Sequence, residues 1–280
     1  MKVFEGRTLA LLTKHNKEKV IQPIFEVETG CNFIVENAFD TDILGAFSRE
    51  ILREKSQLET AREKIKICMN LSSAEIFIAS EGSFGPHPMF PMPWNVEIIL
   101  LYDKISKYEM FGIYKGSETN FDHITTRDWS EALDFSVKVG FPEHFLILRP
   151  SNENGSPVIK DIDTLEKFEK AFKKCKARSL TRNVFIETDM RAHANPTRMK
   201  NIALASMDLV KKINNLCPMC GFYGFVVTEV IKGLPCELCR LPSELTLKHV
   251  FSCHRCKHVA EELHPIGEFA SPQYCHNCNP

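Results

Sequence analysis

The sequence lacks any long hydrophobic run, because no stretch of its 280 residues reaches the roughly 18 apolar residues needed to cross a bilayer. It also lacks an excess of charge of either sign: 35 basic and 36 acidic side chains leave a net charge of −1. A general polyanion binder normally carries a basic excess, so this balance argues against one. The composition, 44% hydrophobic and 25% charged, is typical of a globular chain with a proper core.

The first residues lack the features of a secretory signal. In MKVFEGRTLALLTKHNKEK a short apolar run is followed at once by charge, and no small-residue cleavage site is present. Paired CxxC spacing without an export signal is typical of metal binding in a reducing compartment. We therefore expect a cytoplasmic protein that does not associate with a membrane.

Cysteine is abundant and unevenly placed. Eight of the eleven cysteines lie in CxxC pairs within the C-terminal tail, namely Cys217, Cys220, Cys236, Cys239, Cys253, Cys256, Cys275 and Cys278. Two CxxC pairs supply the four sulfurs of a tetrahedral zinc site, and the intervals between successive pairs fit those of zinc ribbons. We predict two structural Zn²⁺ ions. Sequential pairing is the simpler arrangement, and an interleaved one stays open.

The expected charge of this tail disfavours nucleic acid as a partner. Residues 211–280 hold seven Lys or Arg and six Glu, and eight thiolates with two Zn²⁺ bring the balance to about −3. That sign opposes attraction to phosphate. We expect the zinc to fold a segment too small to build its own core, and a protein is the favoured partner of the tail over RNA.

The first two hundred residues alternate between strand-like and helix-like patterns. Strands are expected at 7–13, 31–36, 75–79, 96–102, 108–114, 144–148 and 183–187, and helices at 15–28, 56–69, 130–139, 163–176 and 197–215. This alternation predicts an α/β fold with a mixed sheet flanked by helices. We place the α/β domain at residues 1–212 and a small zinc-ribbon domain with two four-cysteine sites at 213–280.

Two polar segments precede expected helices of the α/β domain. The first offers Lys14 and Lys17 at a helix N-terminus, which suits phosphate. The second offers Asp42 and Glu50, which could hold Mg²⁺, and Arg53, which could face a phosphate. The alternatives are a solvated charged turn for the first segment and turn and capping chemistry for the second.

A third segment, ASEGSFGPHP, follows an expected strand. Open α/β sheets bind ligands at such an edge. Glu81, Ser83 and His87 lie there, and two glycines permit close approach of a ligand to the backbone. We predict that this loop contributes to an active site.

A fourth segment, ETDMRAHANPTRM, gathers the densest set of polar groups. Its candidate residues are Glu187, Asp189, Arg191, His193, Asn195 and Arg198. The two carboxylates share a strand face if the strand persists and suit a divalent ion, while the two arginines could clamp a phosphate. Asn195 precedes the proline that opens the last helix and could simply cap it. An ion-pair network is the alternative for the whole run.

Together these segments resemble an uncharacterised bacterial family of unknown function. Its members carry, in order, a TKHxKE-type start, a TDxxGxFS run, an ASEGSFGPHP loop, an ETDMRAHxNPTRM run and C-terminal CxxC pairs, all of which have counterparts here. One departure is Arg49, where the resemblance implies glycine. The resemblance covers nearly the whole chain and brings no activity with it.

The order of strands and charged helix starts is also similar to that of inosine-triphosphatase and Maf-type nucleotide pyrophosphatases. The similarity implies that Lys14 or Lys17 would grip phosphate and that Glu50 and Glu81 would hold Mg²⁺. This is an analogy at the level of the fold.

These observations favour a Mg²⁺-dependent hydrolase or transferase acting on a small, phosphorylated, nucleotide-like ligand. Glu81, His87, Glu187, Asp189 and His193 are the candidate catalytic groups. The alternative is a non-enzymatic zinc-ribbon module that binds a protein or RNA partner. A third interpretation has the polar segments bracing long loops without any activity.

Overall fold

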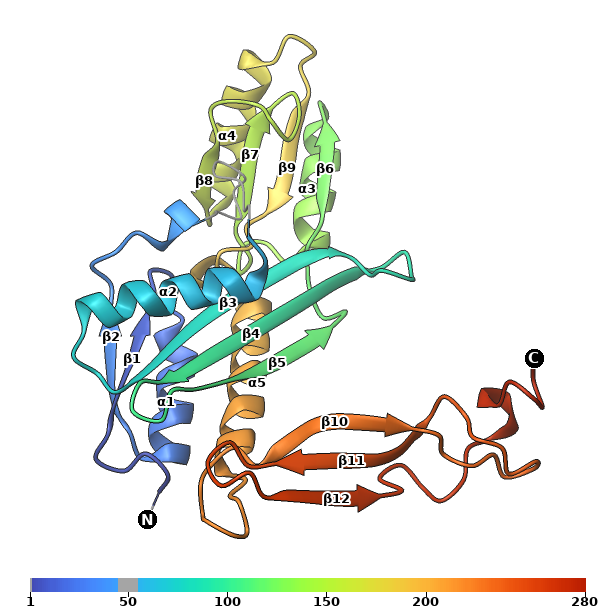
Figure 1. Ribbon diagram of the computed structural model, residues 1–280. Coiled ribbons are helices and arrows are strands. Elements are labelled where there is room, and N and C mark those ends of the chain that lie inside the picture. The colour runs from blue at the N-terminus through green and yellow to red at the C-terminus, as the bar shows by residue number, and fades with distance from the viewer. Residues whose placement is uncertain (1, 45–54) are drawn as a thin grey trace. The chain divides into compact units, whose positions relative to one another are not determined.

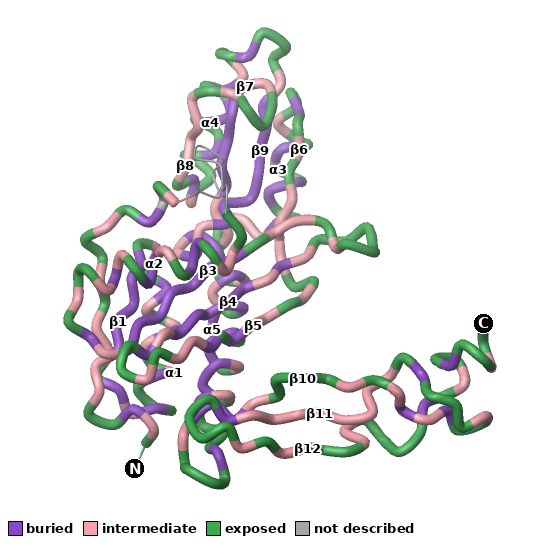
Figure 2. The backbone as a smooth tube through the Cα atoms, viewed as in Figure 1, coloured by how far each residue is buried: buried purple, intermediate pink, exposed green. Residues whose placement is uncertain are grey.

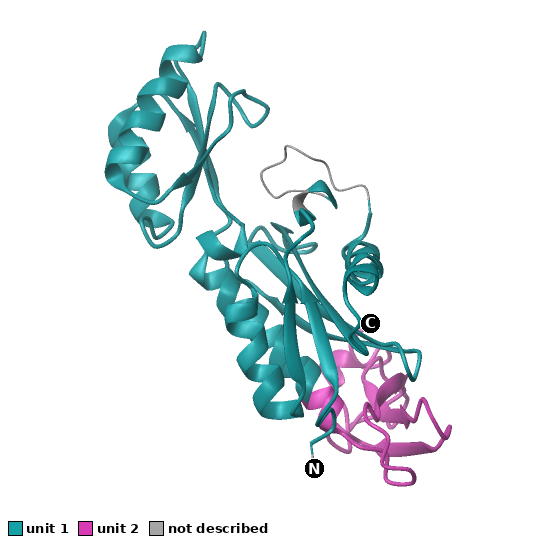
Figure 3. Cartoon of the chain, turned by 90° about the vertical axis from the view of Figure 1, so that its left-hand side faces the viewer, with its two compact units in different colours: residues 1–210 teal, residues 211–280 magenta. Residues whose placement is uncertain are grey.

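The computed structural model describes residues 2–44 and 55–280. The chain divides into two units, Met1–Val210 and Lys211–Pro280 (Figure 3). The first unit contains β1 (Thr8–Leu12), α1 (Glu18–Thr29), β2 (Asn32–Glu36), α2 (Gln57–Leu71), β3 (Ile76–Pro86), β4 (Pro93–Asp103), β5 (Tyr108–Gly116), β6 (His123–Thr126), α3 (Trp129–Lys138), β7 (Leu146–Pro150), β8 (Ile159–Ile162), α4 (Leu165–Arg178), β9 (Val184–Thr188) and most of α5 (Pro196–Asn214).

The first sheet of unit 1 has the strand order β2-β1-β3-β4-β5. β1 runs parallel to β2 and β3, while β3, β4 and β5 form an antiparallel meander. Helix α2 covers one face of the sheet, where Ile65 and Cys68 join Phe77 and Leu100 in a core cluster. Helices α1 and α5 cover the other face (Figure 1). The predicted mixed α/β fold is confirmed.

The second sheet of unit 1 has the strand order β6-β9-β7-β8. Phe135 of α3 and Phe168 and Phe172 of α4 pack with Leu148 and Ile186 of the sheet in a separate core cluster. The two sheets therefore have distinct interiors, visible as two buried regions in Figure 2. The edge strands β6 and β8 have only four residues each, and sequence pattern did not indicate them.

The third polar segment is part of a strand and not the loop that we predicted. β3 continues to Pro86. It pairs with β4 without interruption, from Ile76 opposite Asp103 to Pro86 opposite Pro93. Glycine and proline in this stretch lower its strand propensity, but an antiparallel neighbour of equal length overrides that local preference. Glu81 is consequently held on a rigid strand.

Unit 2 is an antiparallel sheet of β10 (Val226–Lys232), β11 (Thr246–Ser252) and β12 (Val259–Leu263). Its apolar interior is small: Phe225 and the buried cysteines Cys217 and Cys253 form one cluster, with Phe251 packed against it. No helix among the described residues is long and apolar enough to cross a membrane.

The three cysteines outside the tail are buried among apolar neighbours. Cys31, Cys68 and Cys175 are at most 5% exposed. Burial raises the pKa of Cys68 to about 12 and that of Cys175 to about 11, so both remain protonated thiols at neutral pH. These three cysteines are therefore core residues.

Close packing of α5 on β5 depends on Gly112. A Cβ atom at this position would overlap the backbone oxygen of Ala205 and the backbone nitrogen of Leu209. We expect Gly112→Ala to lower the free energy of unfolding by about 1–3 kcal/mol, because the helix must move away from the sheet. Gly85→Ala is the matched control, since its Cβ would meet nothing within 4 Å. Urea denaturation of both variants measures the difference, and equal stabilities would contradict the close approach.

Candidate functional site

Lys17 lies at the end of the parallel part of the first sheet. β1 pairs with β3 only as far as Ile78, whereas β3 continues to Pro86. From about Ser80 onward, no strand of the described residues pairs with this edge of β3, and we call it the open edge. The ammonium of Lys17 fills this edge by donating to the Ser80 carbonyl oxygen at 3.0 Å and lies 3.3 Å from its hydroxyl oxygen. Only 6% of Lys17 is exposed. The helix start therefore delivers a buried cation to the strand edge where α/β sheets bind ligands.

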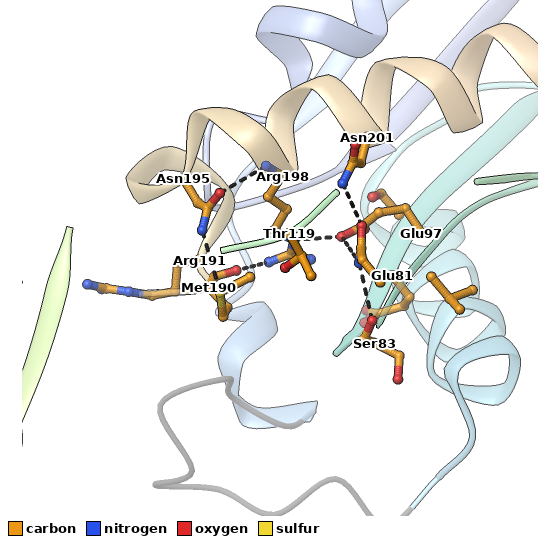
Figure 4. A network of polar contacts seen from close by, with 12 residues as sticks. Glu81, Ser83, Glu97, Thr119, Met190, Arg191, Asn195, Arg198 and Asn201 are labelled. Carbon is orange, nitrogen blue, oxygen red and sulfur yellow. Dashed lines mark hydrogen bonds and ion pairs between the residues drawn. The ribbon is translucent and has the colours of Figure 1, made fainter. Parts of the chain in front are cut away.

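Two buried ion pairs lie on opposite faces of the sheet next to this edge. On the α2 face, Lys64 lies 2.5 Å from Glu81 of β3. On the α5 face, the Nε atom of Arg198 lies 2.9 Å from Glu97 of β4 (Figure 4). Lys17 interacts electrostatically with all four of these groups. Together the five residues, hereafter the edge cluster, bring three basic groups to two carboxylates.

Arg198 is fixed from several directions. Its backbone N–H donates to the Asn195 side chain at 2.9 Å, which caps α5, and its Nη1 donates to the Met190 carbonyl oxygen. Gly82 lies directly against the ion pair, because a Cβ there would be 2.5 Å from a Glu97 oxygen and 2.6 Å from Arg198 Nη2. Glycine is thus required at this position by the charged pair itself.

Two asparagines extend the polar network around Glu97. Asn95 donates to Glu97 Oε1 at 3.3 Å, and Asn201 of α5 donates to the Asn95 side chain at 2.8 Å. The second oxygen of Glu97 is buried and has no hydrogen-bond partner among the residues that the structure describes. That atom is one place where a ligand or water could be accommodated.

Burial lowers the pKa of Lys17 to about 7, and the positive charges of Arg198 and Lys64 act in the same direction. Lys17 is consequently close to half-protonated at neutral pH. An anion bound beside it would favour the charged form, so the edge cluster is electrostatically suited to a phosphate or carboxylate ligand.

The structure brings together three of the residues that the sequence patterns singled out, Lys17, Glu81 and Arg198. It adds Lys64 and Glu97, which those patterns did not indicate. The available signal for Glu97 was a single carboxylate inside the apolar run VEIILL, where a charge must be paired if the strand is buried. Lys64 could not be singled out, because it is one of several charged residues in the sequence of α2.

Glu187 and Asp189 are each held by a different arginine. Glu187 lies 3.2 Å from Arg149, and both are buried. Asp189 is fully buried and is held by the Nε and Nη2 atoms of Arg191 at 2.5–3.1 Å. Arg191 also contacts Asp161 at 2.7 Å. The arginines that we expected to clamp phosphate, Arg191 and Arg198, are both engaged by carboxylates.

The candidate histidines occupy different places. His193 stacks on His15 with 5.1 Å between the ring centroids. His15 precedes Lys17 by two positions in the chain. Burial, and next the charge of Arg191, lower the pKa of His193 below its usual value. His87 lies beyond the end of β3, about 20 Å along the strand from Glu81, and packs against Trp94.

The remaining candidates lie at the surface or outside the described residues. Ser83 is exposed, and Lys14 forms an ion pair with Asp40 at 2.7 Å. Glu50 and Arg53 lie outside the described residues. Asp42 belongs to the short helical turn Thr41–Leu44, and its side chain is likewise not described.

The tail cysteines form two groups that could each hold Zn²⁺. One group contains Cys217, Cys220, Cys253 and Cys256, and the other contains Cys236, Cys239, Cys275 and Cys278. The pairing is therefore interleaved, and the simpler sequential arrangement is wrong. We call the tight turn formed by each CxxC pair a knuckle. The antiparallel sheet explains the interleaved pairing, because pairing of β10 with β11 places the knuckle before β10 beside the knuckle after β11.

The sulfur positions fit zinc. Within each group, sulfur atoms of the two CxxC pairs lie 3.6 to 3.9 Å apart. This is close to the roughly 3.8 Å edge of a tetrahedron with Zn–S bonds of about 2.3 Å. Three knuckles share one local turn, in which the fourth residue after the first cysteine has a positive φ and donates to that cysteine's carbonyl. These residues are Gly221, Arg240 and Lys257.

Fold and sites together define a mixed α/β protein joined to a cysteine-rich metal-binding module. Residues 64–280 match the family described as Domain of unknown function (DUF6671), and the chain belongs to this family. No curated protein matches the sequence significantly. The matched region includes four members of the edge cluster and all eight tail cysteines, whereas Lys17 precedes it.

The interleaved pairing can be tested by replacing whole knuckles with serine. Replacing Cys217, Cys220, Cys253 and Cys256 removes one group completely, so we expect the variant to retain one tightly bound Zn²⁺ per chain. Replacing Cys217, Cys220, Cys236 and Cys239 leaves only two ligands in each group, so we expect no tight binding. Zinc content after dialysis against a weak chelator measures both. Sequential pairing would give the opposite result.

The depressed pKa of Lys17 predicts a specific pH dependence of stability. Between pH about 7 and the usual 10.5 of lysine, the unfolded chain keeps a proton that the folded protein has released. Stability therefore rises with pH in this range, and the unfavourable contribution of Lys17 is largest below pH 7. We expect Lys17→Met to stabilise the protein most near pH 6.5 and progressively less up to about pH 10. A difference in unfolding free energy that is constant with pH would contradict the burial of a titrating lysine.

Proposed function

We propose that unit 1 is a Mg²⁺-dependent hydrolase or transferase that acts on a phosphorylated, nucleotide-like substrate at the edge cluster. The observation that carries this proposal is the placement of Lys17, Lys64 and Glu81 at the open edge of β3. Cations there can neutralise phosphoryl oxygens, and a carboxylate beside them can orient a water or bind a metal. The similarity in element order to nucleotide pyrophosphatases supports the same assignment.

Each member of the edge cluster receives a distinct role in this proposal. Lys17 and Lys64 bind phosphate oxygens, and Glu81 acts as the metal ligand or general base. Arg198 is a positioning residue, because its guanidinium already binds Glu97 through Nε and the Met190 carbonyl oxygen through Nη1. His193 is the proposed proton carrier near the Lys17 end of the site. Glu187 and Asp189 stabilise the segment that delivers Arg198.

The donor set is compatible with Mg²⁺ that enters with its substrate. Among residues 2–44 and 55–280, only the two cysteine groups bring three or more His, Cys, Asp or Glu ligand atoms within 4.8 Å of one another. Mg²⁺ usually binds through one or two carboxylates, water and the substrate's own phosphates. Glu81 would supply the protein carboxylate, and Asp42 and Glu50 remain predicted ligands. The bound metal would neutralise negative charge on the phosphates.

Catalysis by the edge cluster is tested with Glu81→Gln. We expect the purified protein to release phosphate or pyrophosphate from at least one nucleotide in a panel supplied with Mg²⁺. The substitution should lower this turnover by about 100-fold or more, because the isosteric amide cannot act as a base. Glu109→Gln is the matched control, since Glu109 forms an exposed ion pair with Arg62. Magnesium is omitted rather than chelated, so that zinc stays bound.

Two results would contradict this function. One is equal turnover by the parent protein and Glu81→Gln, and the other is the absence of turnover with every nucleotide tested while the protein is folded and loaded with zinc.

A second candidate function is a docking module for a protein partner in unit 2, with the zinc ions as structural elements. The supporting observation is that Val230, Val259 and Leu263 on its strands are each more than half exposed. Deletion of residues 216–280 distinguishes the two functions. Loss of partner binding with nucleotide turnover retained would support docking by unit 2.

A further inference from the structure

A cavity of about 330 Å³ lies between helix α4 and the edge strand β8 in the second sheet of unit 1. Its charged lining consists of Lys160, Asp161, Lys167, Lys170 and Lys174. Four basic side chains thus face one carboxylate. The volume is at the lower end of the range for small-molecule sites.

The lysines of α4 differ in how their charges are compensated. Lys167 pairs with Asp163 at 2.7 Å, and Lys173, which does not line the cavity, pairs with Glu169 at 2.5 Å. For Lys170 and Lys174, no carboxylate of the described residues lies within ion-pair distance. They are four positions apart on the helix, where like charges repel. An external anion in the cavity would relieve this repulsion.

The charge imbalance is specific to this helix. α4 carries six basic and two acidic side chains, whereas the whole chain has a net charge of −1. Without α4 the chain has 29 basic and 34 acidic side chains, a net charge of −5, so attraction of anions is concentrated at α4 and is not a general property of the protein.

The single carboxylate of the cavity is neutralised from another side. Asp161 has a left-handed backbone (φ 60°) within a bulge of β8, where Ile159 and Ile162 pair with Leu148 and Leu146. Its carboxylate lies 2.7 Å from Arg191. Burial would raise the pKa of Asp161, but Arg191 outweighs that effect and keeps it below its usual value. The bulge therefore turns Asp161 toward Arg191, and the charges of Lys170 and Lys174 remain available to a ligand.

We propose that this cavity is a second ligand site of unit 1, specific for a small phosphorylated anion such as a nucleoside diphosphate. Lys170 and Lys174 bind the phosphate oxygens, and Lys160 and Lys167 complete the positive lining. Ile159 and Ala171, which also line the cavity, contact the apolar part of the ligand. This site is independent of the edge cluster and does not rest on its proposed activity.

Lysine reactivity provides a test that is specific for each residue. The full-length, zinc-loaded protein is treated with an acetylating reagent with and without ADP, and modification is measured by mass spectrometry. We expect ADP to slow modification of Lys170 and Lys174 several-fold and to leave Lys173 unchanged, although all three are exposed residues of one helix. Equal protection of the three lysines, or no protection, would overturn the proposal.

Affinity measurements with matched variants complete the test. Lys170→Gln/Lys174→Gln should weaken ADP binding at this site at least 10-fold. Lys173→Gln/Lys138→Gln removes the same charge from outside the cavity and should leave it unchanged. Binding of inorganic pyrophosphate with the same dependence on Lys170 and Lys174 shows that phosphate alone is recognised, which also supports the site. Binding of a short RNA but of neither ADP nor pyrophosphate would overturn it.

Discussion

The buried ion pair between Arg198 and Glu97 joins parts of unit 1 that are distant in sequence. Taking two charges out of water costs several kcal/mol for each ion unless each is paired and hydrogen-bonded. Here Arg198 is bound by Glu97 and by the Met190 carbonyl, and Asn95 donates to the same carboxylate oxygen. The pair requires α5, β4 and the turn after β9 to be in place together. Loss of either partner would leave a buried charge unpaired.

This constraint gives the polar segments separate tasks. Glu187 near the end of β9 and Asp189 just after it hold arginines. The start of α5 presents Arg198, and opposite faces of the sheet present Glu81 on β3 and Glu97 on β4. Lys17, at the start of α1, donates to the Ser80 carbonyl oxygen at the edge of β3 that these elements frame. A frame of paired charges thus adjoins Lys17, Lys64 and Glu81, the groups to which we assign ligand binding. That division is typical of binding sites built on strands and helix ends.

The fold class and most helices could be predicted from the sequence because their patterns are local. Lys17, Glu81 and Arg198 could be found since each belongs to a polar run that follows an expected strand. Lys64 and Glu97 were missed, because their partners lie far away in sequence and cannot be inferred from neighbouring residues. The length of β3 was missed for a similar reason, because pairing with β4 and not local composition extends it. Pairing of the cysteine knuckles was undecidable locally, since three of the four share one turn and differ only in their distant partners.

The interleaved cysteine groups impose an order on how the tail can fold. In each group the two CxxC pairs are separated by a long segment that contains a pair of the other group. In the first group, the second pair, Cys253 and Cys256, follows β11. A ribosome-bound chain that has exposed only Cys217, Cys220, Cys236 and Cys239 holds four thiols from two different final sites. Zinc captured by those four would be trapped in a non-native sequential arrangement. Productive folding therefore depends on ligand exchange, or on zinc arriving after the sheet has paired, so metal supply during synthesis would influence the yield of native protein.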